Sequence, residues 1–203
     1  MNKTINATRI RTSFKELMPY SEIEISVKIQ NASDDRDLTK AIKESYRMID
    51  RTTGYIDVRS LYRYLQLNVS KYAPRIVRSE EEVTIPVFCF AFSRQYVAYT
   101  SKWEIQESAR SLKGIALGDM AVISLTQYYE LERGAIVKPP QGTKGMGFSQ
   151  TIIHECGHMV GLMHPFQFGQ VNDFVDSPMS YFSYSYNFSQ FDRDALQRGH
   201  ADR

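Results

Sequence analysis

An eleven-residue segment, His154 to His164, constrains this chain more than any other part of its sequence. It reads His-Glu-Cys-Gly-His-Met-Val-Gly-Leu-Met-His and holds three of the four histidines in the 203 residues. Positions four apart on a helix project from the same face, so His154 and His158 can approach one ligand together. We expect Ser149 to cap this helix. Apolar side chains surround nearly the whole helix, which predicts that it is buried. They are Ile152, Ile153, Cys156, Met159, Val160 and Leu162.

Two histidines on one helix leave a metal site half built, and the residues that follow can complete it. Gly161 can adopt a positive φ, which ends the helix and turns the chain so that His164 approaches from the far side. Pro165 prevents a return to helix. Catalytic zinc takes three protein ligands, with nitrogen at about 2.0–2.1 Å, and keeps a fourth position for water. The sequence therefore predicts one Zn²⁺ ion bound by His154, His158 and His164.

Glu155, next to the first of these histidines, is the candidate general base. Zinc lowers the pKa of a bound water to about 7, and a glutamate can accept the proton of that water and deliver it to a leaving amine. A lone histidine is more often a core or surface residue than a ligand. For this composition, however, a chance match to the whole pattern is on the order of one in 10⁵. We interpret the segment as a catalytic zinc site.

The pattern from His154 to His164 resembles that of the metzincins, a clan of zinc endopeptidases that includes astacins, serralysins, matrixins and adamalysins. Pro165, directly after the third histidine, is similar to the serralysin variant. Metzincins also place a methionine turn beneath the zinc, and Ser177-Pro178-Met179-Ser180-Tyr181 resembles it, with Met179 as the hydrophobic floor. In serralysins and astacins a tyrosine two residues after this methionine binds the metal and, on swinging away, stabilises the oxyanion. The resemblance gives this role to Tyr181. The alternative is packing in an aromatic cluster with Phe182, Tyr184 and Tyr186.

The resemblance extends to two further regions. Asp192-Arg193-Asp194-Ala195-Leu196-Gln197 is similar to the last helix of matrixins and serralysins, which packs under the active site, so Asp192 is expected to support the site. Lys113–Leu125 resembles the sheet of archaemetzincins, but no cysteine follows Cys156 to hold the second zinc of that family. No serralysin calcium-repeat segment is present. The resemblance therefore implies the clan over residues 149–197 and leaves the family open.

The composition is that of a globular domain. Hydrophobic residues make up 42% of the chain, and the net charge of +2, with scattered basic residues, does not favour nucleic acid or an anionic membrane as partner. The longest apolar stretch, Val83–Phe92, is too short for a transmembrane helix. Residues 1–14 lack a signal-peptide core, so we expect a removed signal or one domain of a longer protein. Cys89 and Cys156 are too few for a disulfide framework, and two free thiols are favoured over one bridge.

Five of the six asparagines stand in N-glycosylation sequons, where about one is expected by chance. They are Asn2, Asn6, Asn31, Asn68 and Asn187. Because sequons are short, chance matches are the alternative. The excess predicts a secreted or cell-surface glycoprotein.

Apolar periodicity predicts both strands and helices. Alternation predicts a half-buried strand at Glu22–Gln30, and spacings of three and four predict an amphipathic helix from Ser33 to Ile49. Val83–Ser93 is predicted to be a central strand, and Leu61–Val69 fits either a strand or a short helix. The remaining expectations are a helix at Trp103–Lys113, strands at Ile115–Leu117 and Met120–Thr126 joined by a Gly118-Asp119 turn, a loop at Gly134–Gly147, and a terminal helix through Gln197 capped by Ser189 with Asp192.

The expected architecture is a metzincin-like α/β (α+β) fold. Its upper lobe would hold a twisted mixed sheet and two long helices, and its small irregular lower lobe would end in a C-terminal helix. Residues 1–18 would be a polar lead-in segment, and residues 19–203 a single catalytic domain with lobes at about 19–161 and 162–203. The zinc would lie between these lobes, and a substrate peptide would pair with an edge strand within Gly114–Met120.

Three functions fit these features. The first is a zinc endopeptidase that acts on extracellular proteins. The second is a zinc aminopeptidase of archaemetzincin-like type, which would need an acidic group to hold a free amine. The third is a non-catalytic surface module with a structural zinc, against which the intact Glu155 and the open fourth position argue. In the first two, the expected partner is a protein or peptide substrate; the oligomeric state is left open.

Overall fold

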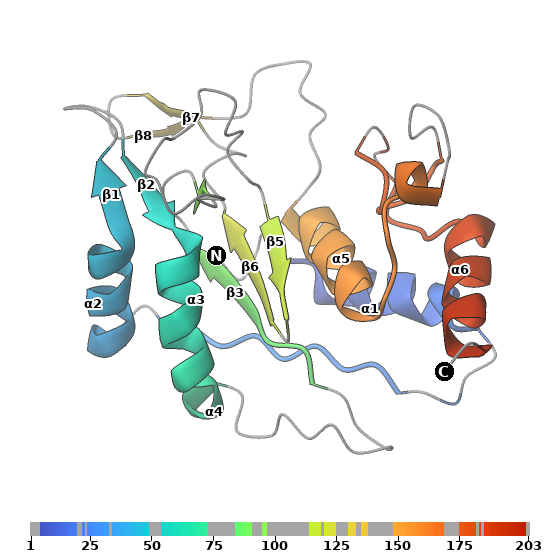
Figure 1. The fold of residues 1–203 in the computed structure, drawn as a ribbon, viewed down its shortest axis with the longest axis horizontal. Helices are drawn as coiled ribbons and strands as arrows, with labels where there is room; N and C mark the ends of the chain where they lie inside the picture. Colours follow the sequence, from blue (N-terminus) through green and yellow to red (C-terminus); the bar gives the residue numbers. More distant parts are fainter. Residues whose placement is uncertain are drawn as a thin grey trace. The chain divides into compact units, whose positions relative to one another are not determined.

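The computed structural model describes residues 5–19, 22, 24–32, 34–48, 54–72, 84–90, 95–96, 114–118, 120–124, 130–132, 135–137, 148–168, 175–181, 183 and 185–201. The chain forms two compact units. Residues 1–29 and 138–203 make the terminal unit, and residues 30–137 make the central unit. The fold is mixed α/β, with six α-helices in the described residues (Figure 1). The predicted lobe boundary near Gly161 stays a prediction.

The central unit packs two helices against a small mixed sheet. Its core joins α2 (Arg36–Ser45), α3 (Val58–Leu67) and strand β6 (Met120–Ser124). In the described part of this sheet β6 lies between β3 (Val87–Phe90), to which it is parallel, and β5 (Gly114–Leu117), to which it is antiparallel. Residues on both faces of β6 are fully buried, as expected for a central strand. The core residues are Leu38, Ala41, Leu61, Leu65, Met120 and Val122.

The other strands of the central unit form two smaller sheets. β1 (Tyr46–Met48) and β2 (Gly54–Asp57) are antiparallel, and β2 pairs in parallel with β4 (Gln95–Tyr96). β7 (Glu130–Glu132) and β8 (Ala135–Val137) are an antiparallel pair. α4 (Val69–Tyr72) follows α3 after one residue.

The central unit contains the two strands predicted after residue 114, and its first helix is shorter than predicted. The strands at Ile115–Leu117 and Met120–Thr126 are confirmed as antiparallel β5 and β6, with Gly118 at φ 60° in the turn. Leu61–Val69 is mainly helical. The helix expected over Ser33–Ile49 begins at Arg36, where Asp35 Oδ1 accepts from the backbone N–H of Asp37 and Leu38, and it gives way to β1 at Tyr46.

One predicted strand and one predicted loop of this unit differ from the structure. The strand expected over Val83–Ser93 is β3, and it lies at an edge of the described three-stranded sheet instead of its centre. The side chains of β3 are half-buried. The β-branched and aromatic residues that predicted this strand suit an edge strand as well as a central one, so they could not show its position in the sheet. The loop expected over Gly134–Gly147 begins with strand β8. The helix expected at Trp103–Lys113 lies outside the described residues.

The terminal unit joins the two ends of the chain. α1 (Ala7–Leu17) packs against α5 (Phe148–Met159), and the backbone N–H of Asn6 donates to Ser149 Oγ at 2.8 Å. α6 (Gln190–Ala201) is held to α1 by Arg193, whose Nε donates to the Glu16 carbonyl at 3.0 Å. The rings of Phe14 and Phe188 are 5.3 Å apart. These contacts join α1 to α5 and to α6, which are both distant from it in sequence.

Two expectations for the N-terminal region are wrong. Residues 1–18 include helix α1 where only a polar lead-in was expected, because the buried Ile10, Phe14 and Leu17 form an apolar stripe on an otherwise polar helix. Of the strand expected at Glu22–Gln30, the described residues form neither helix nor strand. Alternation of apolar residues predicts which side chains are covered, and Ile25 and Val27 are half-buried, but a strand also needs a pairing partner.

None of the described helices has the length and apolar character needed to cross a membrane.

Candidate metal centre

Helix α5 carries the first two histidines and ends directly after them. The backbone N–H of Leu162 donates to the Gly157 carbonyl at 2.9 Å, and that of Gly161 donates to the His158 carbonyl at 3.0 Å. These two bonds form a Schellman C-cap, in which Gly161 has φ 98°. A residue with a Cβ would pay about 1–2 kcal/mol in this backbone conformation. The predicted role of Gly161 as the residue that turns the chain toward His164 therefore agrees with the geometry.

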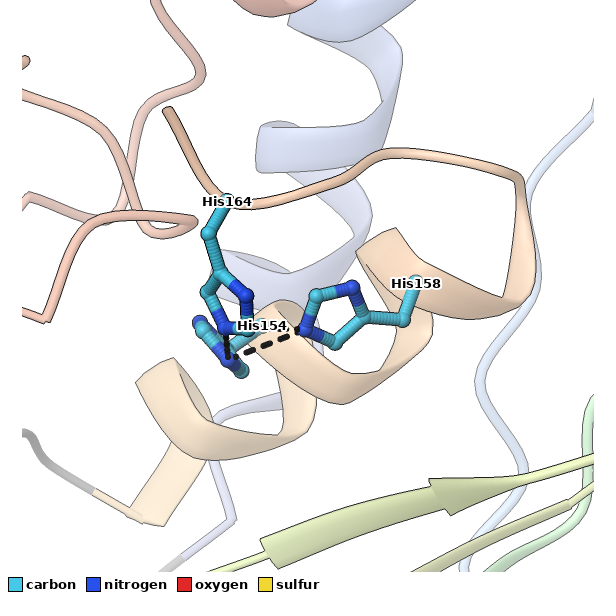
Figure 2. Close-up of side chains that lie close together, drawn as sticks. All are labelled: His154, His158 and His164. Carbon is cyan, nitrogen blue, oxygen red and sulfur yellow. Dashed lines mark hydrogen bonds between the residues drawn. The ribbon is translucent and has the colours of Figure 1, made fainter. Parts of the chain in front are cut away.

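The three histidine side chains converge on one point (Figure 2). The Nε2 atom of His158 lies 3.2 Å from that of His154 and 3.3 Å from that of His164, and the third side of this triangle is also 3.3 Å. A tetrahedral metal with nitrogen ligands at about 2.0–2.1 Å separates its ligand atoms by about 3.3–3.4 Å. The triangle therefore has the dimensions of one face of a tetrahedral coordination shell.

Each of the three rings has an acceptor at its other nitrogen. His154 Nδ1 donates to the Pro178 carbonyl at 2.7 Å, and His158 Nδ1 donates to the Leu162 carbonyl at 2.8 Å. His164 Nδ1 lies 3.2 Å from the side-chain oxygen of Gln167. A carbonyl oxygen can only accept, so the ring proton of each neutral imidazole stands on Nδ1 and Nε2 offers a lone pair.

Burial favours the uncharged form of the two rings on α5. It lowers the pKa of His154 to about 3, against the opposing hydrogen bond to Pro178, and it also lowers the pKa of His158. Three Nε2 lone pairs that lie 3.2–3.3 Å apart repel one another unless a cation lies between them. The group of His154, His158 and His164 can therefore bind a metal ion, as the sequence predicted. That this ion is zinc stays a prediction.

Glu155 is buried on α5, with 6% of its surface exposed. Successive residues on a helix are rotated by about 100°, so Glu155 does not share the face of its neighbour His154. It lies outside the metal-binding group found among the described residues. A carboxyl next to the ligands but not among them is what the predicted role of general base requires.

The segment around Met179 is a tight turn at the metal centre. The Ser180 N–H donates to the Ser177 carbonyl at 3.1 Å, and the Met179 N–H donates to Ser177 Oγ at 3.0 Å. Pro178, inside this turn, supplies the carbonyl that receives the His154 proton. Met179 is fully buried. The turn thus packs its methionine in the interior and orients one ligand.

Gly157 has a role that sequence reasoning missed. A Cβ built on this residue would collide with Met179 Sδ and lie 3.3 Å from Met179 Cε. Gly157 stands between His154 and His158 in the sequence, and its lack of a side chain lets Met179 pack directly against α5. No local pattern reveals this requirement, because it depends on a contact with a residue far along the chain.

Tyr181 lies beside the metal centre. Its ring is 4.4 Å from that of His164 and 5.9 Å from that of His154, and 57% of the residue is exposed. Phe166, which the sequence did not single out, stacks on His164 with centroids 5.1 Å apart and planes 11° apart. An aromatic face thus borders the third ligand. Of the alternative cluster, Phe182 and Tyr184 lie outside the described residues, and Tyr186 lies under the guanidinium of Arg9.

Comparison with known protein families, with curated proteins and with solved structures finds no match for this chain. Support for a metal centre therefore comes from the geometry of its three histidines.

Two buried polar residues, Asp192 and Gln150, fix backbone segments of the terminal unit. Asp192, which is 1% exposed, accepts the Ser189 N–H and hydroxyl at Oδ2, both at 2.7 Å, and its own N–H donates back to Ser189 Oγ at 3.3 Å. This confirms the predicted cap of the last helix, which continues past Gln197 to Ala201. Gln150, on α5, donates through Nε2 to the carbonyls of Ser183 and Ser185. Ser149, the expected cap of α5, is instead its second residue.

The glycosylation candidates are mostly at the surface. Asn6, Asn31 and Asn187 are exposed, Asn68 is half-buried, and Asn2 lies outside the described residues. Asn6 caps α1 through Oδ1, which accepts the Arg9 N–H at 2.9 Å. A glycan on Nδ2 would leave that oxygen in place.

Cys89 and Cys156 are not joined by a disulfide, as the sequence favoured. Cys156 is buried on α5, and burial raises the pKa of Cys89 to about 12. Neither is suited to act as a thiolate nucleophile.

Proposed function

We propose that this chain is a zinc-dependent endopeptidase of the metzincin type. One observation carries the proposal: three Nε2 atoms lie 3.2–3.3 Å apart, and each ring has a fixed acceptor at Nδ1. A site with three protein ligands keeps a fourth position for water, as catalytic zinc sites do. The buried Glu155 next to this site supports catalysis over a structural role.

Zinc is the proposed metal because three imidazole nitrogens in a tetrahedral arrangement suit it. When bound, it would supply a Lewis acid that lowers the pKa of water to about 7 and polarises a carbonyl. Glu155 would accept a proton from the attacking water and pass it to the departing amine. Tyr181 would donate a hydrogen bond to the carbonyl oxygen as charge develops there.

The metzincin assignment draws on features outside the ligands. The positive φ of Gly161, the buried Met179 in its turn, and the place of Tyr181 two residues later all fit the resemblance. Exposed apolar side chains on the segments that carry His164 and Tyr181 favour a peptide as substrate. Met163, Phe166, Phe168 and Tyr181 are each about half exposed. Such an apolar border suits the side chains of a peptide better than a small anionic ligand.

The deciding experiment measures metal content and peptide cleavage together. We expect one zinc per chain by elemental analysis, and loss of all cleavage when a chelator removes it. A peptide blocked at its N-terminus should be cut as well as its free counterpart, because an endopeptidase does not need a free amine. Cleavage of only the free peptide would indicate the aminopeptidase, and bound zinc without cleavage of either would indicate a structural module. A metal-free protein, or full activity after chelation, would contradict the assignment.

An extracellular location belongs to the same proposal. The exposure of Asn6, Asn31 and Asn187 is compatible with glycan attachment. We expect at least two of the five sequons to carry glycans in protein from the natural host. Intact-mass analysis before and after deglycosylation measures this, and a bare polypeptide mass would rule out the glycoprotein.

A further inference from the structure

The three ligands of the metal centre are not oriented in the same way. His154 and His158 donate from Nδ1 to backbone carbonyls, those of Pro178 and Leu162. His164 instead faces the side-chain amide of Gln167, at 3.2 Å. This is the longest of the three contacts, and Gln167 is exposed. The acceptor of His164 is therefore the most exposed of the three to solvent. Because the other two acceptors are backbone carbonyls, the Gln167 side chain is also the one acceptor that a substitution can remove.

Gln167 is itself fixed by the backbone. Its Oε1 accepts the His164 N–H at 2.8 Å, while its own N–H donates to the His164 carbonyl at 3.0 Å. A backbone N–H can only donate, so the amide must present its oxygen, and not its nitrogen, toward His164. This is the reaching-back half of a capping box, at the start of the 3-10 turn η2 (Pro165–Phe168). One oxygen thus caps the turn and receives the ring proton.

We propose that Gln167 is a positioning residue that sets the tautomer of His164 and, through it, the affinity of the centre for metal. An imidazole without an acceptor at Nδ1 is free to carry its proton on Nε2, where it blocks the ligand lone pair. With Oε1 in place, the proton stays on Nδ1 and Nε2 faces the other two ligands. The proposal concerns metal binding, and it does not require that the bound metal hydrolyse peptides.

The test compares Gln167→Ala with Gln167→Glu in zinc affinity, measured by competition with a chromophoric chelator. Gln167→Ala should bind zinc about 10–100-fold more weakly, as is typical when an acceptor behind a metal-binding histidine is lost. Gln167→Glu keeps an oxygen acceptor and the cap, so it should bind at least as tightly as the native chain. Gln197→Ala, an exposed glutamine on α6, is the matched control and should change nothing.

A second measurement separates orientation from a loss of folding. Nitrogen-15 NMR of the metal-free protein, at a pH where the rings are neutral, reports which nitrogen of His164 carries the proton. We expect Nδ1–H in the native chain and in Gln167→Glu, and a mixture with Nε2–H in Gln167→Ala, while His154 and His158 stay Nδ1–H. If the affinity of Gln167→Ala is within twofold of the native value, or if the tautomer of His164 is the same in all three proteins, Gln167 only caps the turn and the proposal is wrong. Failure to cleave peptides would leave these readings unchanged.

Discussion

Replacing Glu155 by alanine is expected to leave the metal bound and to lower peptide hydrolysis by about 10²–10⁴-fold. The reason is that Glu155 is buried next to His154 but is not one of the three ligands. Removing its carboxyl would take away the proposed general base, while the Nε2 triangle remains. Turnover of a blocked peptide and zinc per chain, measured on the same preparation, test both halves of this expectation.

Two controls sharpen the Glu155 experiment. Glu155→Gln keeps the size of the buried side chain and removes only its basicity, so it should lose activity to a similar extent without a packing defect. Glu24→Ala removes an exposed carboxyl from the same unit and should leave turnover unchanged. Near-native turnover in both Glu155 variants would mean that another group activates the water.

Tyr181→Phe is expected to keep zinc and substrate affinity and to lower turnover by about 10²–10³-fold. The Tyr181 ring lies 4.4 Å from that of His164 and 57% of the residue is exposed, so Tyr181 borders the proposed substrate site. A donor that contacts only the developing negative charge acts on the transition state, which lowers kcat and leaves KM nearly unchanged. Steady-state kinetics on a blocked peptide separate the two constants.

The matched control for this variant is Tyr186→Phe. Tyr186 lies in the same unit, where the Arg9 guanidinium is 5.0 Å from its ring centroid, and phenylalanine would keep that contact. Its turnover should match that of the native protein. If Tyr181→Phe also stays within twofold of native turnover, Tyr181 serves only as part of the aromatic border of His164.

The three-histidine group could be predicted from sequence because its main determinants are local. The spacing of His154 and His158 follows from the helical repeat, and the positive φ of Gly161 follows from the absence of a Cβ. Gly157 was missed because its role depends on Met179, which only folding brings next to it. Gln167 carried a local signal that was not used: a glutamine three residues after His164, the spacing of a capping box.

The fold was less predictable because sheets depend on contacts between distant residues. The apolar alternation at Glu22–Gln30 was real, but nothing in it indicates whether a partner strand is present. Helix α1 was hidden by its polar composition, although Ile10, Phe14 and Leu17 have helical spacing. The cap of the last helix was predicted correctly because Ser189 and Asp192 interact within one turn.

The terminal unit is built from segments that synthesis separates widely in time. Ser149 bonds to Asn6 across 143 positions, and Arg193 bonds to Glu16 across 177. Closing such long loops costs entropy before any contact compensates for it, and α1 cannot pack against α5 until α5 has been synthesised. The central unit, residues 30–137, is continuous in sequence and can fold earlier. A nascent chain would therefore carry a folded central unit before its histidine triangle forms, so metal capture would follow the folding of the central unit.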